Sequence, residues 1–174
     1  MSKPTDEFMS PPELVELAKR IFGGPIDFDP YGHASQLIPA RDLHSLQTGA
    51  EPWPETGNWW CNPPFSESKF AVPRIAEWYA THREINGLLL CLAAPGSVYW
   101  RESIWSVTHP QRIAWLPRLK FYRIGEDGQA YPTTQTITRD LALGCWSREN
   151  RVLARFDRFL KEFAKPELKV ESYS

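Results

Sequence analysis

The tetrapeptide Asn62-Pro63-Pro64-Phe65 joins residue types that together could hold a planar amine. Asn62 offers a side-chain amide oxygen as a hydrogen-bond acceptor, and the proline that follows disfavours helical geometry at this residue. Two consecutive prolines make a rigid, extended corner, which can present that oxygen beside a backbone carbonyl, with the ring of Phe65 as a flat wall. The pattern indicates a site that accepts two hydrogen bonds from one flat amino group.

A second polar position follows an earlier apolar segment. In residues 25–30, apolar side chains alternate with aspartates, the last of which is Asp29, and Pro30 ends the segment. Residues 58–61, with the sequence NWWC, are typical of another short strand directly before Asn62. Ligands of open α/β sheets bind outside the carboxyl ends of the strands, so we expect Asp29 and Asn62 at the same edge of one sheet.

A helix is predicted in front of the first of these strands. Ser10 is the expected N-cap, with Glu13 closing a capping box, and prolines occupy the first helical positions. Gly23 is the expected stop signal. The apolar residues of this segment share one face: Leu14, Leu17, Ala18 and Ile21.

The remaining chain alternates helix and strand patterns. Residues 87–95 form an uninterrupted apolar run, as expected for a central strand covered on both faces. Helices are predicted within 66–84, with Pro73 near the beginning, and over 148–164; further strands are predicted at 112–117 and 141–147. The fold prediction is α/β: a single, mostly parallel sheet with helices on both faces, in one domain over 1–174 with flexible tails at 1–7 and 166–174.

Composition narrows the class of protein. The 174 residues carry a formal net charge of -1, which excludes a strongly basic, histone-like protein. The three cysteines have apolar neighbours and no CxxC pair, and the four histidines show no metal-ligand spacing, so we expect reduced thiols and no metal site. The sequence shows neither a secretory signal nor an apolar run long enough to span a bilayer. These features favour a cytoplasmic protein without membrane contact.

Several motifs, taken in order, resemble the small phage-type DNA N6-adenine methyltransferase family. They are SPPELVELAKRIFG (10–23), Asp-Pro (29–30), NPPF (62–65), LAAPGSVYW (92–100) and WLPRLKF (115–121), and the similarity covers about Phe8 to Trp146. The Asn-Pro-Pro-Phe motif is also similar to that of other amino-methyltransferases which use S-adenosylmethionine. The resemblance implies a Rossmann-like methyltransferase sheet, in a bacterial host cytoplasm if the chain is phage-encoded.

The resemblance also implies roles for individual residues. The Asn62 oxygen and the Pro63 carbonyl would accept hydrogen bonds from the N6 amine of adenine, Pro64 would stiffen the loop, and Phe65 would stack on the base. The target adenine would be flipped out of a duplex or taken from a single strand. The residues expected to line the S-adenosylmethionine pocket are Ser10, Pro11, Pro12, Asp29 and Pro30.

A basic segment after residue 111 could meet DNA. Cations alternate there with aromatic side chains, the mixture expected where phosphates and exposed bases are bound. The residues predicted to contact DNA are Arg112, Arg118, Lys120, Phe121 and Arg123. In residues 125–140, Gly125, Gly128 and Pro132 favour a long hairpin or loop, whose Gln and Thr side chains could read base edges or fill the gap left by a flipped base.

Each pattern has an alternative reading. Asn-Pro-Pro also suits a simple strand-ending turn, and the basic segment also suits a solvated surface strand. Tyr31-Gly32-His33 separates Asp29-Pro30 from Ala34-Ser35, unlike the shorter spacing of the phage family, and no counterpart of the family's acid before Trp53 stands out, with Asp42 the nearest. The alternatives to a DNA methyltransferase are an inactive module that binds DNA or protein, and an enzyme acting on RNA or protein glutamine. A monomer and a homodimer are both open.

Overall fold

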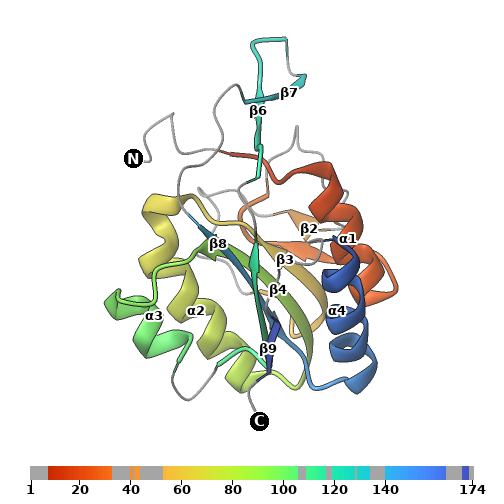
Figure 1. Cartoon of the computed structure of the whole chain (residues 1–174), viewed down its shortest axis with the longest axis vertical. Helices are drawn as coiled ribbons and strands as arrows, with labels where there is room; N and C mark the ends of the chain where they lie inside the picture. The colour runs from red at the N-terminus through yellow and green to blue at the C-terminus, as the bar shows by residue number, and fades with distance from the viewer. Residues whose placement is uncertain are drawn as a thin grey trace.

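The computed structural model describes residues 8–32, 40, 42–43, 53–105, 109–116, 119–127, 129–133, 140–163 and 170–172. Within them, seven strands form one sheet in the order β2-β1-β3-β4-β8-β5-β9, and β6 and β7 form a separate hairpin (Figure 1). The strands are β1 (Phe28–Asp29), β2 (Asp42–Leu43), β3 (Thr56–Cys61), β4 (Glu84–Leu92), β5 (Arg112–Leu116), β6 (Tyr122–Ile124), β7 (Ala130–Pro132), β8 (Leu141–Trp146) and β9 (Val170–Ser172).

The sheet is mixed. Strands β2, β1, β3 and β4 pair in parallel, and β8 is antiparallel to both of its neighbours, β4 and β5. Strand β5 therefore runs in the same direction as β4, and β9 pairs with β5 antiparallel at the edge. The α/β class is confirmed, and the arrangement is compatible with a Rossmann-like sheet.

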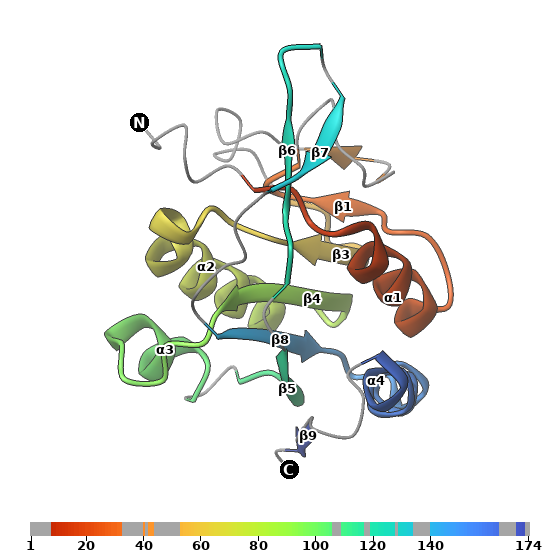
Figure 2. The same cartoon turned by 45° about the horizontal axis from the view of Figure 1, so that its top comes forward.

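Helices cover both faces of the sheet, as predicted (Figure 2). They are α1 (Pro12–Phe22), α2 (Ser68–Thr81), α3 (Val98–Ser103) and α4 (Asn150–Phe163), with a 3-10 turn, η1 (Phe65–Glu67), before α2. Helices α1 and α4 pack side by side on one face, and α2 and α3 pack together on the other. Pro73 lies in the second turn of α2.

The core has two halves because β4 is buried on both faces. Leu88 and Leu90 pack with the cluster beneath α1 and α4, whereas Leu89 and Cys91 pack with the cluster beneath α2 and α3. A strand covered on both sides needs apolar residues at every position rather than at alternate ones. The predicted central strand is confirmed, since β4 is the fourth of the seven strands.

The beginning of α1 differs from the prediction. The helix starts at Pro12, and the N-cap position is occupied by Pro11, which makes no side-chain cap. The predicted capping box of Ser10 and Glu13 is therefore wrong, because the Ser10 hydroxyl is engaged elsewhere. The predicted stop at Gly23 is confirmed: its φ is 72°, a left-handed conformation that glycine adopts without steric cost.

The C-terminal segment also differs from the prediction. Residues Val170–Ser172, placed in a flexible tail by the sequence, form β9 and pair with β5. Pairing with an open strand edge satisfies backbone groups of β5 that would otherwise face solvent. The other predicted tail, 1–7, lies outside the described residues. Among the helices that the structure describes, none is both long and apolar enough to span a bilayer.

Candidate active site

The chain changes its direction of travel across the sheet between β1 and β3. From β1 it passes to β2 on one side, and from β3 it passes through α2 to β4 on the other side. Crevices at such switch points, outside the carboxyl ends of the strands, are where open α/β sheets bind ligands. Asp29 ends β1 and Asn62 follows β3, and the two strands pair directly in parallel. The sheet thus brings these two residues to one edge.

The side chain of Asn62 is held in one orientation. Its Nδ2 donates to the carbonyl of Phe8 at 3.1 Å and to Oγ of Ser10 at 3.1 Å. A backbone carbonyl can only accept, so the amino group, and not the oxygen, must face Phe8. Within the described ranges, no hydrogen bond uses Oδ1 of Asn62. The residue is half-buried, with an acceptor oxygen left over for another donor.

Ser10 sits beneath Asn62. Its hydroxyl oxygen accepts both the Asn62 bond and a bond from Nε1 of Trp60 at 3.0 Å. Ser10 is 3% exposed and Trp60 is fully buried in β3. The serine hydroxyl therefore connects the start of α1 to the strand that carries the Asn-Pro-Pro-Phe loop.

The ring of Phe65 belongs to a cluster of three phenylalanines, Phe8, Phe65 and Phe121, which we call the ring cluster. The Phe65 centroid lies 6.1 Å from that of Phe8 and 6.1 Å from that of Phe121, and Phe8 and Phe121 are 5.9 Å apart. Phe121 is fully buried, whereas Phe65 is half-buried. Packing from two sides fixes the direction of the Phe65 ring and leaves part of it accessible.

The two prolines form the rigid corner that the sequence predicts. Pro63 and Pro64 are both buried, and Pro64 is extended, with φ -50° and ψ 139°. The Pro64 carbonyl accepts from the amide of Glu67 at 2.8 Å, which starts the turn η1. In the part of the chain that the structure describes, no backbone hydrogen bond occupies the Pro63 carbonyl. That carbonyl and Oδ1 of Asn62 are thus two neighbouring acceptors.

Asp29 is a buried carboxyl group at the same edge. It is 2% exposed, and burial raises its pKa from the usual value of 3.8 to about 7, partly opposed by a hydrogen bond from the amide of Tyr31 at 3.0 Å. None of the ion pairs between described residues involves Asp29. A carboxylate removed from water without a cation stabilises a positively charged group that approaches it.

The other residues expected around the cofactor are neighbours of Ser10 or Asp29 in the sequence. Pro30 is buried next to Asp29, and Pro11 is buried next to Ser10. Pro12 is exposed as the first residue of α1. The described residues contain no cluster of side chains suited to a metal ion.

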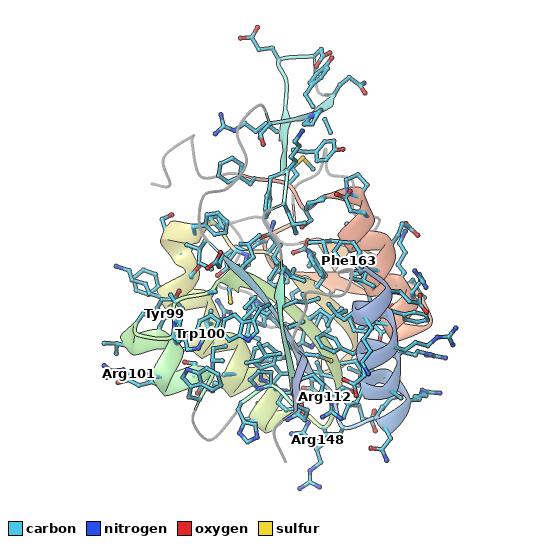
Figure 3. The ribbon with its side chains drawn as sticks, viewed as in Figure 1. Tyr99, Trp100, Arg101, Arg112, Arg148 and Phe163 are labelled. Atoms are coloured by element: carbon cyan, nitrogen blue, oxygen red, sulfur yellow. The ribbon has the colours of Figure 1, made fainter. Side chains whose placement is uncertain are left out.

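The predicted DNA-binding residues separate into two groups. Arg112 begins β5, three strands away from β3, and its Nε donates to both carboxylate oxygens of Asp157 in α4 at 2.9 and 3.1 Å. Figure 3 shows Arg112 at the opposite end of the molecule from the β6–β7 hairpin. Arg112 therefore stabilises the fold rather than facing the Asn62 edge. Arg118 lies outside the described residues.

The rest of the basic segment lies next to the candidate site. Phe121 has no exposed surface to offer DNA and instead supports Phe65 through the ring cluster. Lys120 and Arg123 are exposed, and the guanidinium of Arg123 lies 4.9 Å from the ring centroid of Phe8. Arg123 therefore brings a positive charge to the ring cluster, and Lys120 directly precedes Phe121 of that cluster in the chain.

The β6–β7 hairpin begins at Tyr122, before the hairpin or loop predicted over 125–140, and projects away from the sheet (Figures 1 and 2). At its base, Met9 and Tyr122 form a bridge, with N–O distances of 2.9 and 3.2 Å, and the amide of Thr133 donates to the carbonyl of Phe121. Near its tip, Tyr131 is 52% exposed and its hydroxyl donates to Asp127 at 2.7 Å. The base of the hairpin is therefore bonded to residues in or next to the ring cluster.

Two contributors to the site escaped the sequence analysis. Phe8 supplies both a carbonyl for Asn62 and a ring for the cluster, and Trp60 anchors Ser10. Phe8 precedes the first helix in a segment without periodicity, so no local pattern marks it. Trp60 belongs to the predicted NWWC strand, but a sequence does not show which indole of a strand also donates a buried hydrogen bond.

Comparison with known proteins adds no assignment. No protein-family model matches this sequence, and no curated protein matches it.

Proposed function

We propose that the protein is an S-adenosylmethionine-dependent DNA methyltransferase that modifies the exocyclic N6 amine of adenine. The observation that carries this proposal is the fixed amide of Asn62. Its amino group donates to Phe8 and Ser10, which leaves Oδ1 as an acceptor, and the next residue, Pro63, has a carbonyl that no backbone hydrogen bond among the described residues occupies. The motif resemblance described above points to the same residues.

The two acceptors match the needs of this substrate. The N6 amine shares its lone pair with the purine ring and is therefore a poor nucleophile. Hydrogen bonds from both amine protons to Oδ1 of Asn62 and the carbonyl of Pro63 favour a more tetrahedral nitrogen, whose lone pair is available for attack. The accessible part of the Phe65 ring offers a surface on which the base stacks, a contact type that contributes about 1–3 kcal/mol per base. Positioning of this kind is a large part of catalysis.

The cofactor side of the proposal depends on Asp29. S-adenosylmethionine supplies a methyl group on a sulfonium, together with a cationic ammonium group. A buried carboxyl group that lacks a cation among the described residues suits such a ligand. Asp29 lies at the switch point of the sheet, at the end of the strand adjacent to the one that Asn62 follows, and such an edge suits a site for two substrates. Pro30 follows Asp29 directly and is buried with it, and Pro11 is buried next to Ser10.

The DNA side rests on exposed cations and the protruding hairpin. Exposed Arg123, in contact with the ring cluster, and exposed Lys120, next to Phe121 in the chain, suit backbone phosphates. The hairpin extends beyond the sheet, where it can reach a groove or the position that a flipped base leaves. The strand order, with β8 reversed between β4 and β5, is compatible with the methyltransferase sheet that the resemblance implies.

The direct test is mass spectrometry of nucleosides from DNA incubated with the purified protein and S-adenosylmethionine. We expect N6-methyladenine with the wild type and a rate at least about 100-fold lower with Asn62→Ala, because a preorganised acceptor is removed. The matched control is Asn58→Ala, which removes another hydrogen-bonded asparagine, in the N-terminal half of β3. Its rate should stay within about threefold of the wild type, since it lies outside the site.

Other outcomes would replace the proposal. The absence of any cofactor binding in calorimetry would favour an inactive module that binds DNA or protein. Cofactor binding without N6-methyladenine, combined with methylated guanine in RNA or methylated glutamine in protein, would assign the same acceptors to another planar amine. Near-normal turnover of Asn62→Ala would refute the role of this residue.

A further inference from the structure

The hydroxyl of Ser10 has an unusual set of partners for a residue next to a helix start. A serine just before a helix usually accepts from backbone amides of the first turn, but α1 has no side-chain cap. The Ser10 oxygen instead accepts two side-chain donors, Nε1 of Trp60 and Nδ2 of Asn62. Both donors come from the segment that carries the candidate catalytic loop.

The donor that holds Ser10, Nε1 of Trp60, has a fixed position. Trp60 is fully buried in β3, and Nε1 of an indole can only donate, so this bond has one possible polarity. Ser10 itself is 3% exposed and cannot move without disturbing the core. The Oγ atom is therefore an acceptor with a fixed position, to which Nδ2 of Asn62 donates.

Two acceptors are needed to fix a side-chain amide. With the Phe8 carbonyl alone, Nδ2 of Asn62 could keep one bond while the amide plane turned about it. The second bond, to Oγ of Ser10 at 3.1 Å, defines the plane and with it the direction of Oδ1. The two hydrogen bonds of Nδ2 thus determine the direction in which Oδ1 of Asn62 points.

We propose that Ser10 is a positioning residue for Asn62: its hydroxyl, held by Trp60, fixes the amide so that Oδ1 faces the substrate amine. This inference rests on the proposed methyl transfer to a planar amine. It differs from the cofactor-contact role that the motif resemblance implies for Ser10, and the two roles affect different kinetic constants.

Ser10→Ala removes the acceptor and tests the inference. We expect kcat to fall about tenfold, the effect of one lost hydrogen bond, while the affinity for S-adenosylmethionine in calorimetry stays within about twofold. Ser10→Thr keeps the oxygen and should restore most of the rate. Ser68→Ala is the matched control, because Ser68 is 2% exposed, lies just beyond the same loop, and has no partner for its Oγ among the described residues. Its kcat should match the wild type.

A second measurement does not depend on turnover. In a ¹⁵N-labelled protein, the side-chain amide signals of Asn62, assigned from their absence in Asn62→Asp, report the bonds of Nδ2. We expect faster proton exchange and a changed shift in Ser10→Ala and no change in Ser68→Ala. If Ser10→Ala fails to fold, Ser10→Cys keeps nearly the same shape with a weak sulfur acceptor and should show the same changes.

The outcomes separate the two proposals. An unchanged kcat in Ser10→Ala, or a raised cofactor dissociation constant at unchanged kcat, would overturn the positioning role, as would an equal loss in Ser68→Ala. If the wild type transfers no methyl group, the proposed function fails, and the amide signals alone then decide whether Ser10 orients Asn62.

Discussion

Asp29→Asn should change how the stability of the protein depends on pH. Burial raises the pKa of Asp29 from 3.8 to about 7, so the folded state holds this proton more tightly than the unfolded state does. Between these two values the folded protein is protonated at Asp29 and the unfolded chain is not. Stability therefore falls as the pH rises from about 4 to 7 and then levels off.

The magnitude follows from that interval. Each pH unit over which only the folded state carries the proton lowers the free energy of unfolding by about 1.4 kcal/mol, so the full interval corresponds to about 4 kcal/mol. Asparagine cannot ionise, and its oxygen can still accept from the amide of Tyr31. Asp29→Asn should therefore gain about 4 kcal/mol relative to the wild type between pH 4 and pH 8, whatever offset the variant has at pH 4.

Urea denaturation of both proteins at several pH values measures this difference. Asp127→Asn is the control, because Asp127 is exposed and its hydrogen bonds to Tyr131 and the Gln129 amide lower its pKa. Its pH trend should be small and opposite in sign. A free-energy difference between Asp29→Asn and the wild type that is the same at pH 4 and pH 8 would refute the burial argument. So would a difference that changes in the other direction.

Three further variants test the fold and the proposed DNA surface. Arg112→Ala should lower the free energy of unfolding by about 1 kcal/mol, because it removes a half-buried pair with Asp157, and leave DNA affinity unchanged in a gel-shift assay. Lys120→Ala should leave the free energy of unfolding unchanged, weaken DNA binding and reduce its salt dependence by about one ion. Equal DNA affinities for the wild type and Lys120→Ala would contradict the proposed surface. Gly87→Ala should destabilise the fold by about 1–3 kcal/mol in thermal unfolding, because a Cβ there would lie 2.3 Å from the ring of Trp59. Unfolding at the wild-type temperature would show that the ring can move aside.

The sequence predicts the elements whose signals are local. The stripe of α1, its stop at Gly23 and the continuous apolar run of β4 each follow from a few neighbouring residues, and each is confirmed. Antiparallel β8 between β4 and β5 could not be predicted, because its apolar residues suit either direction. Helix α3 was missed since its six residues are too few to show a helical period.

The candidate site also has features that the sequence predicts and features that it does not. Asn62 and Asp29 could be placed at one edge, because both follow strand-like segments and parallel strands share a carboxyl end. The partners of Asn62 could not, since Phe8 and Ser10 are more than 50 positions away and only the folded chain brings them near. Ser10 illustrates the limit of local signals, because its hydroxyl binds the side chains of Trp60 and Asn62 instead of capping α1. Arg112 shows the converse, because its charge looks available until Asp157 of α4 is placed beside it.

The base and the tip of the β6–β7 hairpin are stabilised by different contacts. Its base is fastened by Met9, Phe121 and Thr133, whereas its tip is closed by bonds within itself, from Tyr131 to Asp127 and from Gly125 to Gln129. Changes confined to the tip therefore leave the sheet and the Asn62 loop untouched. Under the proposed function, grafting a different loop between β6 and β7 would change target choice on an unaltered scaffold, in the same manner that antibody frameworks accept new loops.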